Sequence, residues 1–218
     1  MNSAHGNAAD HMDRIYRYQR TIYNLTRKPV LLGRDRLLNQ LRPPRHGTIL
    51  EIGCGTARNL IRAARLYPNA QFFGIDVSVS MLATAERDVV RAGLGDRIRL
   101  AQADATDFNA EDLFGESRFD RVFISYALSM IPPWRDVLRH SLALLGSGGA
   151  LHIVDFGQQE RLPAWFQMLL FAWLRRFSVK PEPELPETLE KLSHAKGMEF
   201  RFVPLYRGYA YSAVVQNP

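Results

Sequence analysis

The stretch ILEIGCGTARN, residues 49–59, decides the fold of this chain. Its apolar first half is typical of a buried strand, and its glycines are typical of a turn that opens a helix. Gly53 and Gly55 allow a tight turn and a close approach of the backbone to a ligand. The next apolar run, QFFGID at 71–76, ends in Asp76, which lies 23 residues after Gly53. Nucleotide-binding α/β folds place an acid about 20 residues after the glycines to hold ribose hydroxyls, so this order predicts a ligand with a ribose.

The acid inside the motif separates two kinds of ligand. A dinucleotide-binding turn has the pattern GxGxxG and points a helix N-terminus at a pyrophosphate. Here the pattern is ExGxGxA, and Glu51 would repel a phosphate but suit the cationic amino-acid end of a ligand. This pattern resembles motif I of the class I S-adenosylmethionine-dependent methyltransferases, in which the position of Ala57 is usually glycine. The resemblance continues in three further stretches: FFGIDVSVSML (72–82), AQADATDF (101–108) and FDRVFISYALSMI (119–131).

The order of the predicted elements indicates an α/β protein. Strands are expected at 48–53, 70–76, 97–102, 119–125 and 149–155, and helices at about 10–26, 30–41, 56–66, 79–92, 109–114 and 134–145. This alternation predicts a parallel sheet with helices on both faces. The resemblance implies a Rossmann-like, seven-stranded, mostly parallel sheet with a terminal antiparallel hairpin at about 197–216 and an N-terminal helical lid. We divide the chain into that lid, 1–46, which would face substrate and membrane, and a methyltransferase domain, 47–218.

The resemblance implies a pocket for S-adenosylmethionine and no metal. The backbone of Gly53 and Gly55 would line the methionine part of the cofactor, and Glu51 would meet its amino group directly or through water. Asp76 would accept hydrogen bonds from both ribose hydroxyls. A helix cap or a turn is the simpler alternative for this acid and for Asp104.

The remaining matched positions belong to the adenine and the reacting methyl. Val77 and Met81 would pack near the adenine. Asp104 would accept from the adenine amino group, and Ala105 would donate its backbone N–H to the ring. Ser125, with the tyrosine after it, follows a strand at the place where family members present residues towards the transferred methyl.

Composition limits the class of protein and its surroundings. The 218 residues suffice for one α/β domain. The single cysteine, Cys54, excludes an internal disulfide and is expected to fill the glycine turn rather than act as a nucleophile. The N-terminus has no apolar core typical of a signal peptide, and no apolar run approaches the ~20 residues that span a bilayer. We therefore expect a cytoplasmic protein.

Positive charge is concentrated in the first third of the chain. The net charge is +6, and residues 1–65 contain twelve Lys or Arg against four Asp or Glu. Such a region suits nucleic acid, an anionic membrane or an acidic substrate, and a solvated helix face explains it equally well. It contains no recognisable RNA-binding module, so we expect no nucleic-acid partner. Nothing in the sequence indicates an obligate protein partner.

The segment LPAWFQMLLFAWLRRFSVK, 162–180, is too apolar for an ordinary exposed helix and too short to cross a bilayer. A helix at about 162–177 would carry two tryptophans and end in basic residues, which is typical of a helix lying in a membrane interface. A buried core helix and a dimer interface are the alternatives. We favour peripheral association with the anionic inner face of the cytoplasmic membrane.

The N-terminal stretch HMDRIYRYQRTIYNLTRKPVLLGRDRLL, 11–38, together with SYALSMIPPW, 125–134, resembles the bacterial N-methyltransferases of betaine-lipid synthesis. These convert diacylglyceryl-homoserine to diacylglyceryl-trimethylhomoserine by three successive methylations. The resemblance implies a lipid amine substrate. Tyrosines around the amine can bind a methylated ammonium by cation–π contact, and we expect Tyr16, Tyr23 and Tyr126 to form that wall.

Two further roles concern the charged ends of this substrate. Asp155, at the end of the fifth predicted strand, is the favoured acid near the amine, ahead of His152 nearby and of His140 in mid-helix. A basic residue would pair with the homoserine carboxylate, and the sequence does not choose among the candidates Arg27, Lys28 and Arg34.

Other functions fit parts of the same pattern. A phosphatidylethanolamine N-methyltransferase would share the cofactor core and the membrane surface. A soluble methyltransferase acting on a quinone precursor or a metabolite would not need an exposed apolar helix. An RNA methyltransferase and a non-catalytic cofactor-binding or membrane-scaffold protein are the remaining alternatives.

Overall fold

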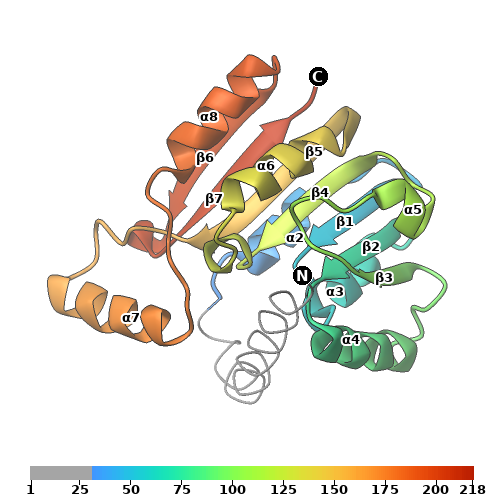
Figure 1. Ribbon diagram of the computed structural model, residues 1–218, viewed down its shortest axis with the longest axis horizontal. Helices are drawn as coiled ribbons and strands as arrows, with labels where there is room; N and C mark the ends of the chain where they lie inside the picture. Colours follow the sequence, from blue (N-terminus) through green and yellow to red (C-terminus); the bar gives the residue numbers. More distant parts are fainter. Residues whose placement is uncertain (1–30) are drawn as a thin grey trace, which may run out of the picture.

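The computed structural model describes residues 31–218, which form one twisted seven-stranded sheet covered by helices on both faces (Figure 1). The strand order is β3-β2-β1-β4-β5-β7-β6. The strands are β1 (Thr48–Ile52), β2 (Gln71–Asp76), β3 (Ile98–Gln102), β4 (Phe119–Ser125), β5 (Leu145–Phe156), β6 (Glu199–Leu205) and β7 (Ala210–Gln216). The first five strands pair in parallel, and β7 pairs antiparallel with both β5 and β6. The predicted Rossmann-like sheet with its terminal antiparallel hairpin is confirmed.

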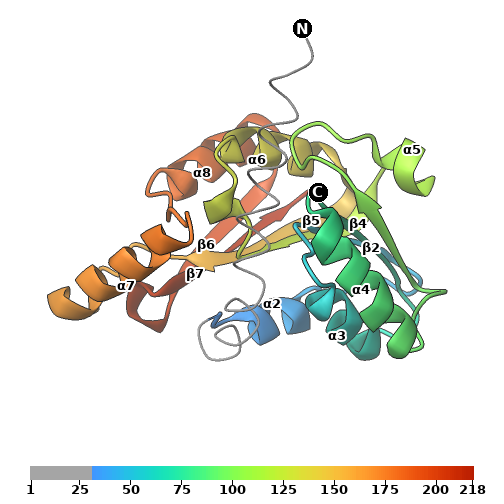
Figure 2. The ribbon, with the colours of Figure 1, turned by 60° about the horizontal axis from the view of Figure 1, so that its bottom comes forward.

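The helices are α2 (Arg34–Gln40), α3 (Arg58–Leu66), α4 (Val79–Arg91), α5 (Ala110–Phe114), α6 (Trp134–Ala143), α7 (Ala164–Arg176) and α8 (Leu185–Ala195), with short 3-10 turns η1 (Leu128–Met130) and η2 (Tyr206–Gly208). They form two layers, which Figure 2 shows on opposite faces of the sheet. One apolar core lies beneath α5, α6 and α8, and the other beneath α2, α3, α4 and the inner face of α7.

The apolar strands explain why both faces are covered. In β1, Leu50 and Ile52 contribute to one core, while Ile49 contributes to the other. Parallel strands are buried on both faces and therefore consist of nearly continuous apolar residues. Because adjacent parallel strands end at the same edge, the order β2-β1-β4 brings the residues after these three strands together.

Two element boundaries lie several residues from the sequence-based expectations, and one helix lies where none was expected. α2 begins at Arg34 rather than near Val30, because Gly33 adopts a left-handed conformation with φ of 87° at the helix N-cap. β5 begins at Leu145, ahead of the GGA sequence where a strand was expected to begin. α8 was not predicted at all. The helix expected at about 10–26 lies outside the described residues.

The helix of the apolar segment, α7, has 13 residues. Between residues 31 and 218, no helix is both long enough and apolar enough to cross a membrane.

Candidate active site

A cavity of about 210 Å³ opens at the carboxyl ends of β1, β2 and β4. This is the point where the strand order reverses, which is where open α/β sheets bind their ligands. It is lined by Gly53, Gly55, Ile75, Asp76, Val77, Met81, Ala103, Asp104, Ala105, Ser125, Tyr126, Ala127, Met130, Ile131, Pro132 and Pro133. All predicted cofactor residues except Glu51 line this cavity.

The glycine turn is shaped by the neighbouring strands. Gly53 has φ of +72°, and a Cβ at this position would approach the Cβ of Ala127 to 2.6 Å. Only glycine fits both the conformation and the space. The amides of Gly53 and Cys54 both donate to the carbonyl of Ile75, at 2.9 Å each, which ties the turn to β2. The backbone is thereby held at the wall of the cavity.

Asp76 holds the floor of the site together. One carboxylate oxygen accepts from the amide of Gly55 at 2.7 Å, and the other accepts from the amide of Ser78 at 2.9 Å. A carboxylate has about four acceptor sites, so these two bonds do not by themselves exhaust its capacity to accept hydrogen bonds. The predicted ribose role and the alternative role of a turn residue are therefore compatible in one side chain.

Asp104 has the same double character. Its Oδ1 accepts from the amide of Thr106 at 2.9 Å and from the Thr106 hydroxyl at 2.7 Å, which is the geometry of an Asx turn. The residue also lines the cavity beside Ala105. Both residues follow β3, which is separated by β2 from β1 and its glycine turn.

Glu51 is buried at 1% exposure and lies in β1 rather than at the cavity wall. Its Oε1 accepts from Asn59 Nδ2 at 2.7 Å. Asn59, at the start of α3, was given no function from the sequence, and this contact identifies it as the residue that orients Glu51. The predicted contact of Glu51 with a ligand amino group stays a prediction.

Ser125 and Tyr126 follow β4 and line the cavity. The hydroxyl of Ser125 is buried and makes no protein hydrogen bond. A buried hydroxyl without a partner costs free energy, so this atom fits a polar ligand in the cavity. Together with the glycine turn and Asp76, it makes the residues present suitable for S-adenosylmethionine.

The hydroxyl group of Tyr126 forms a hydrogen bond within the protein. Its backbone is left-handed with φ of 55°, and its hydroxyl donates to the carbonyl of Leu32 at 2.5 Å. Burial, with Asp155 adding to it, raises the pKa of Tyr126 far above its ordinary value, so the phenol is neutral. A neutral phenol does not act as a base, and the predicted role of Tyr126 in the aromatic wall around the amine stays a prediction.

Asp155 lies outside the cavity lining, at 1% exposure. Its carboxylate accepts from the amide and the hydroxyl of Ser129, at 3.0 and 2.7 Å, and thereby holds η1 against β5. Burial raises its pKa to about 6, against the lowering effect of the Ser129 and Phe156 hydrogen bonds. In this position, Asp155 supports the cavity wall, and its predicted role as the acid near the amine stays a prediction.

Of the two histidines that the sequence offers, His152 is buried and His140 is partly buried. Burial, and then the charge of Arg121, lowers the pKa of His152 to about 4, so its imidazole is neutral. His140, on α6, packs edge-on against the ring of Phe108, with ring centroids 4.7 Å apart. Neither residue lines the cavity.

The remaining candidates divide between the described part and the rest. Cys54 is buried, and burial raises the pKa of its thiol, as expected of a filler rather than a nucleophile. Arg34 is 9% exposed and its Nε donates to the carbonyl of Leu31. Tyr16, Tyr23, Arg27 and Lys28 lie outside the described residues. From residue 31 onward, no cluster of three or more His, Cys, Asp or Glu side chains suits a metal ion.

One wall of the cavity was missed by the sequence reasoning. It is formed by Met130, Ile131, Pro132 and Pro133, which connect η1 to α6. The run belongs to the stretch 125–134, whose resemblance concerns the family, and no periodicity marks its side chains as facing a ligand. Only the apolar character of an apparent loop could have indicated it.

A Rossmann-like sheet with this glycine turn, an acid after β2 and a cavity at the switch point is an arrangement in which open α/β sheets bind ligands that contain a ribose. Residues 49–149 match the family model described as a methyltransferase domain. A demethylmenaquinone methyltransferase of Bacteroides fragilis is 24% identical over 163 residues, and one of Listeria monocytogenes is 28% identical over 136 residues. These alignments cover 72% and 62% of this chain. They cover 65% and 55% of the relatives, so the chain spans less than two thirds of the proteins it matches.

Solved structures agree on the fold. The crystal structure of a SAM-dependent methyltransferase from Aquifex aeolicus superposes with a TM-score of 0.65 at 16% identity, covering 97% of this chain and 98% of that one. The fold is thus the Rossmann-like methyltransferase fold. Over residues 49–149 the chain is thus similar to methyltransferase domains.

Proposed function

We propose that the protein is an S-adenosylmethionine-dependent N-methyltransferase that acts on a lipid amine, converting diacylglyceryl-homoserine to diacylglyceryl-trimethylhomoserine in three methylations. The observation that carries the lipid part is the exposed apolar face of α7. Trp165, Met168 and Leu169 are 63%, 66% and 58% exposed, and all three belong to α7. Large apolar side chains that lie together on a protein surface typically mark a site that binds a membrane, a ligand or another protein.

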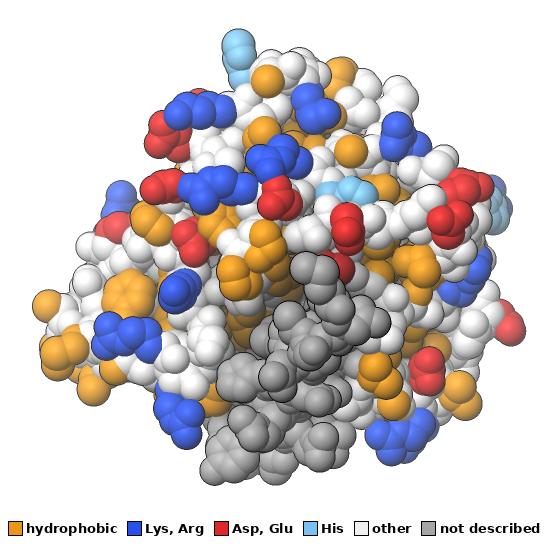
Figure 3. Space-filling view, viewed as in Figure 1, with side chains coloured by type: hydrophobic (Ala, Val, Ile, Leu, Met, Phe, Trp, Pro, Cys, Tyr) orange, Lys and Arg blue, Asp and Glu red, His pale blue; other side chains and the backbone are white. Residues whose placement is uncertain are grey.

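The surroundings of α7 favour an anionic membrane as the surface it meets. Arg175 and Arg176 are exposed in its last turn, and Lys180 is exposed shortly after it. Figure 3 shows basic and apolar side chains side by side over α7, at the left edge of the molecule. Tryptophan together with terminal basic residues is typical of interfacial helices.

The end of α7 is also connected to the cavity. The amide of Lys180 donates to the carbonyl of Ser129 in η1, at 2.8 Å. Residue 130 in the same turn, a methionine, lines the cavity. If α7 binds a membrane, this contact would therefore place the cavity wall close to the lipid headgroups.

The chemistry asked of the protein is mainly alignment. S-adenosylmethionine, when bound, would supply a methyl group on a sulfonium: the amine nitrogen would form the new N–C bond, and the electrons of the broken S–C bond would stay on the sulfur. The chain must admit a neutral amine, because an ammonium has no lone pair, and the proton released after each transfer must leave before the next. The apolar wall at 130–133 favours the neutral amine by keeping water away.

The protein groups at the cavity have corresponding tasks. Asp76 and the glycine turn would bind the polar end of the cofactor, and the Ser125 hydroxyl would bind at its reacting end. The Tyr126 ring would face the amine and tolerate zero, one or two existing methyl groups, since an aromatic face binds by contact and cation–π attraction rather than by a fixed number of hydrogen bonds.

A second candidate is C-methylation of a quinone precursor. It is favoured by the names of the Bacteroides and Listeria relatives, both of which are called demethylmenaquinone methyltransferase. A quinone with a long isoprenoid tail is also an amphiphile that resides in membranes, so the exposed face of α7 suits it as well. A phosphatidylethanolamine acceptor would use the same surface but carries a phosphate in place of the carboxylate.

One assay separates these acceptors. Labelled S-adenosylmethionine is supplied with vesicles containing diacylglyceryl-homoserine, phosphatidylethanolamine or demethylmenaquinone, and the products are resolved by mass. Products with one, two and three added methyl groups on the homoserine lipid support the proposal. Methylation of only the quinone or only the phospholipid replaces it with that candidate. Transfer to none of them, with cofactor bound, refutes a lipid acceptor.

A further inference from the structure

An apolar groove of about 440 Å³ lies against the inner face of α7. It is lined by Leu32, Leu162, Phe166, Leu170, Trp173, Tyr206 and Tyr209. All seven side chains are aliphatic or aromatic, and its volume is within the ~300–1,000 Å³ typical of small-molecule sites. Nothing in the binding of the cofactor accounts for this groove.

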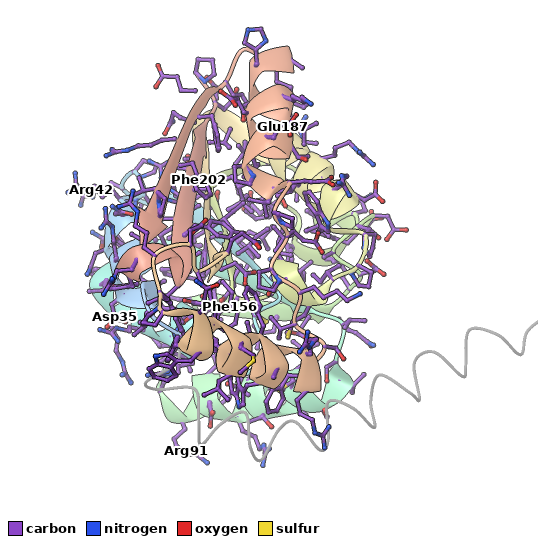
Figure 4. The ribbon with its side chains drawn as sticks, turned by 90° about the vertical axis from the view of Figure 1, so that its left-hand side faces the viewer. Asp35, Arg42, Arg91, Phe156, Glu187 and Phe202 are labelled. Carbon is purple, nitrogen blue, oxygen red and sulfur yellow. The ribbon has the colours of Figure 1, made fainter. Side chains whose placement is uncertain are left out.

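Tyr126 separates the groove from the cavity. Its ring lines the cavity, and its hydroxyl donates to the carbonyl of Leu32, which lines the groove. The ring of Phe156 continues this partition, with its centroid 4.7 Å from that of Tyr126 and 5.8 Å from that of Tyr209. Figure 4 looks onto α7 and labels Phe156, which belongs to the same apolar core as Leu174 of this helix. The aromatic rings of Tyr126, Phe156 and Tyr209 thus connect the lining of the cavity with the lining of the groove.

The charge around the groove indicates the kind of molecule that enters it. Arg161 precedes α7, and Arg175 and Arg176 end it, all three exposed. An amphiphile with a carboxylate or phosphate in its headgroup would keep that group near this basic rim. Its hydrocarbon part would exchange water for the groove, which favours binding by about 25 cal/mol for each Å² of apolar surface removed from water.

We propose that the groove binds a hydrocarbon chain of the acceptor lipid, while the amine of the same molecule lies across Tyr126 in the cavity. The identity of the acceptor rests on the proposed function, but the binding of a hydrocarbon chain does not. The groove then makes the protein selective: it raises the affinity for long-chain amphiphiles and leaves the affinity for the free headgroup unchanged.

Trp173 provides a direct readout, because it is the tryptophan that lines the groove. Of the other two tryptophans, Trp134 is 2% exposed in the core and Trp165 is exposed on α7. Full-length protein carrying Trp165→Phe is titrated with a long-chain lysolipid brominated in mid-chain, below its micellar concentration. We expect saturable quenching of Trp173 fluorescence. Absence of quenching overturns the proposal and leaves the groove to another part of this chain or to a second copy.

Leucines inside and outside the groove give a matched pair of variants. Leu170→Gln places an amide in the groove and should weaken probe binding by about tenfold, because it removes much of one leucine contact. Leu66→Gln makes the same change on α3, at a position that is 44% exposed and outside the groove, and it should bind as the parent does. Leu170→Phe fills the groove without adding polarity, and we expect the same loss. Equal affinity in all variants, with unchanged thermal unfolding, overturns the site.

Activity then distinguishes this inference from the proposed function. With the long-chain homoserine lipid, Leu170→Gln should raise KM by about tenfold, and with the water-soluble O-glyceryl homoserine ether, which lacks the acyl chains, it should leave KM unchanged. If no lipid amine is methylated but the brominated chain still quenches Trp173, the proposed function fails and the groove stands. If the lipid is methylated and Leu170→Gln changes neither KM nor quenching, the groove fails and the function stands.

Discussion

Asp76 combines a structural and a binding role in one carboxylate. It accepts from the amides of Gly55 and Ser78, and it lines the cavity. We expect Asp76→Ala to weaken S-adenosylmethionine binding by more than about 100-fold. The variant would lose the two expected hydrogen bonds from the ribose hydroxyls to this carboxylate, and each hydrogen bond to a charged group is worth ~1.5–3 kcal/mol. Isothermal titration calorimetry measures this, with Asp88→Ala, in an exposed pair on α4, as the control. Wild-type affinity in Asp76→Ala would show that the pocket is assigned to the wrong residues.

Gly53 is restricted by space as well as by conformation. Its φ is +72° and an added Cβ would meet Ala127 at 2.6 Å, whereas Gly93 has φ of +68° with nothing within 4 Å. Gly93→Ala therefore measures the conformational cost alone, about 1 kcal/mol. We expect Gly53→Ala to lower the free energy of unfolding by about 1–3 kcal/mol more, since overpacking adds to it. Urea unfolding compares the two variants, and equal losses would contradict the close contact.

His152 and Asp155 have opposite linkages to pH. Burial lowers the pKa of His152 from 6.5 to about 4, so its contribution to stability is present above pH 6.5 and is lost as pH falls through 4. Burial raises the pKa of Asp155 from 3.8 to about 6, so its contribution is present below pH 3.8 and is lost as pH rises through 6. Each is worth about 3 kcal/mol at ~1.36 kcal/mol per pKa unit. The two slopes largely cancel in the wild type.

Substituting one member of this pair should reveal the other. Relative to the wild type, we expect His152→Phe to lose about 3 kcal/mol of unfolding free energy as pH rises through the window between the two pKa values, about 4 to about 6. Asp155→Asn should show the opposite slope over the same range. Urea unfolding at several pH values measures both differences. Differences that do not change with pH would show that neither group titrates as its burial requires.

Among the elements, α7 is the one whose outer face is not explained by the core. We expect the triple variant Trp165→Ser, Met168→Ser, Leu169→Ser to bind phosphatidylglycerol-rich vesicles at least about tenfold more weakly, because each buried CH₂ group contributes ~0.8 kcal/mol. Vesicle co-sedimentation measures the change. Val90→Ser, at a 74% exposed apolar position on α4, is the control and should bind as the wild type does. Equal binding of all three proteins would remove α7 from any membrane role.

The elements also show how far the sequence is informative. The strands β1 to β4 were predicted within one residue at each end, because strands buried on both faces appear as continuous apolar runs between turn residues. α8 was missed because Pro181, Pro183 and Pro186 favour a loop. Pro186 instead occupies the first turn of the helix, where a missing N–H costs nothing. Leu185 and Leu189 of α8 pack into the apolar core formed with the sheet, and this packing cannot be read from the local sequence.

The site divides along the same line. Gly53 and Asp76 were predictable because the turn and the strand end impose a fixed spacing on them. The apolar wall at 130–133 and the support from Asp155 were not, because they depend on η1 meeting β5 across the sheet. The position of Tyr126 after β4 was predictable, whereas its bond to Leu32 joins residues 94 apart in sequence. Contacts of this length are set by topology rather than by pattern.

At the scale of the whole molecule, we propose that the cofactor domain and the segment that holds the methyl acceptor are separable in sequence. The described residues include the complete seven-stranded sheet and its two apolar cores, whereas residues 1–28 carry five basic residues and two of the tyrosines expected around the amine. We expect deletion of 1–28 to retain cooperative thermal unfolding and the circular dichroism of the α/β fold, but to abolish methyl transfer to the homoserine lipid. The double variant Tyr16→Phe, Tyr23→Phe is the milder comparison, and it should retain the cation–π faces and most of the activity. Full activity after the deletion would place the acceptor site entirely within residues 29–218 and assign the aromatic wall to Tyr126 alone.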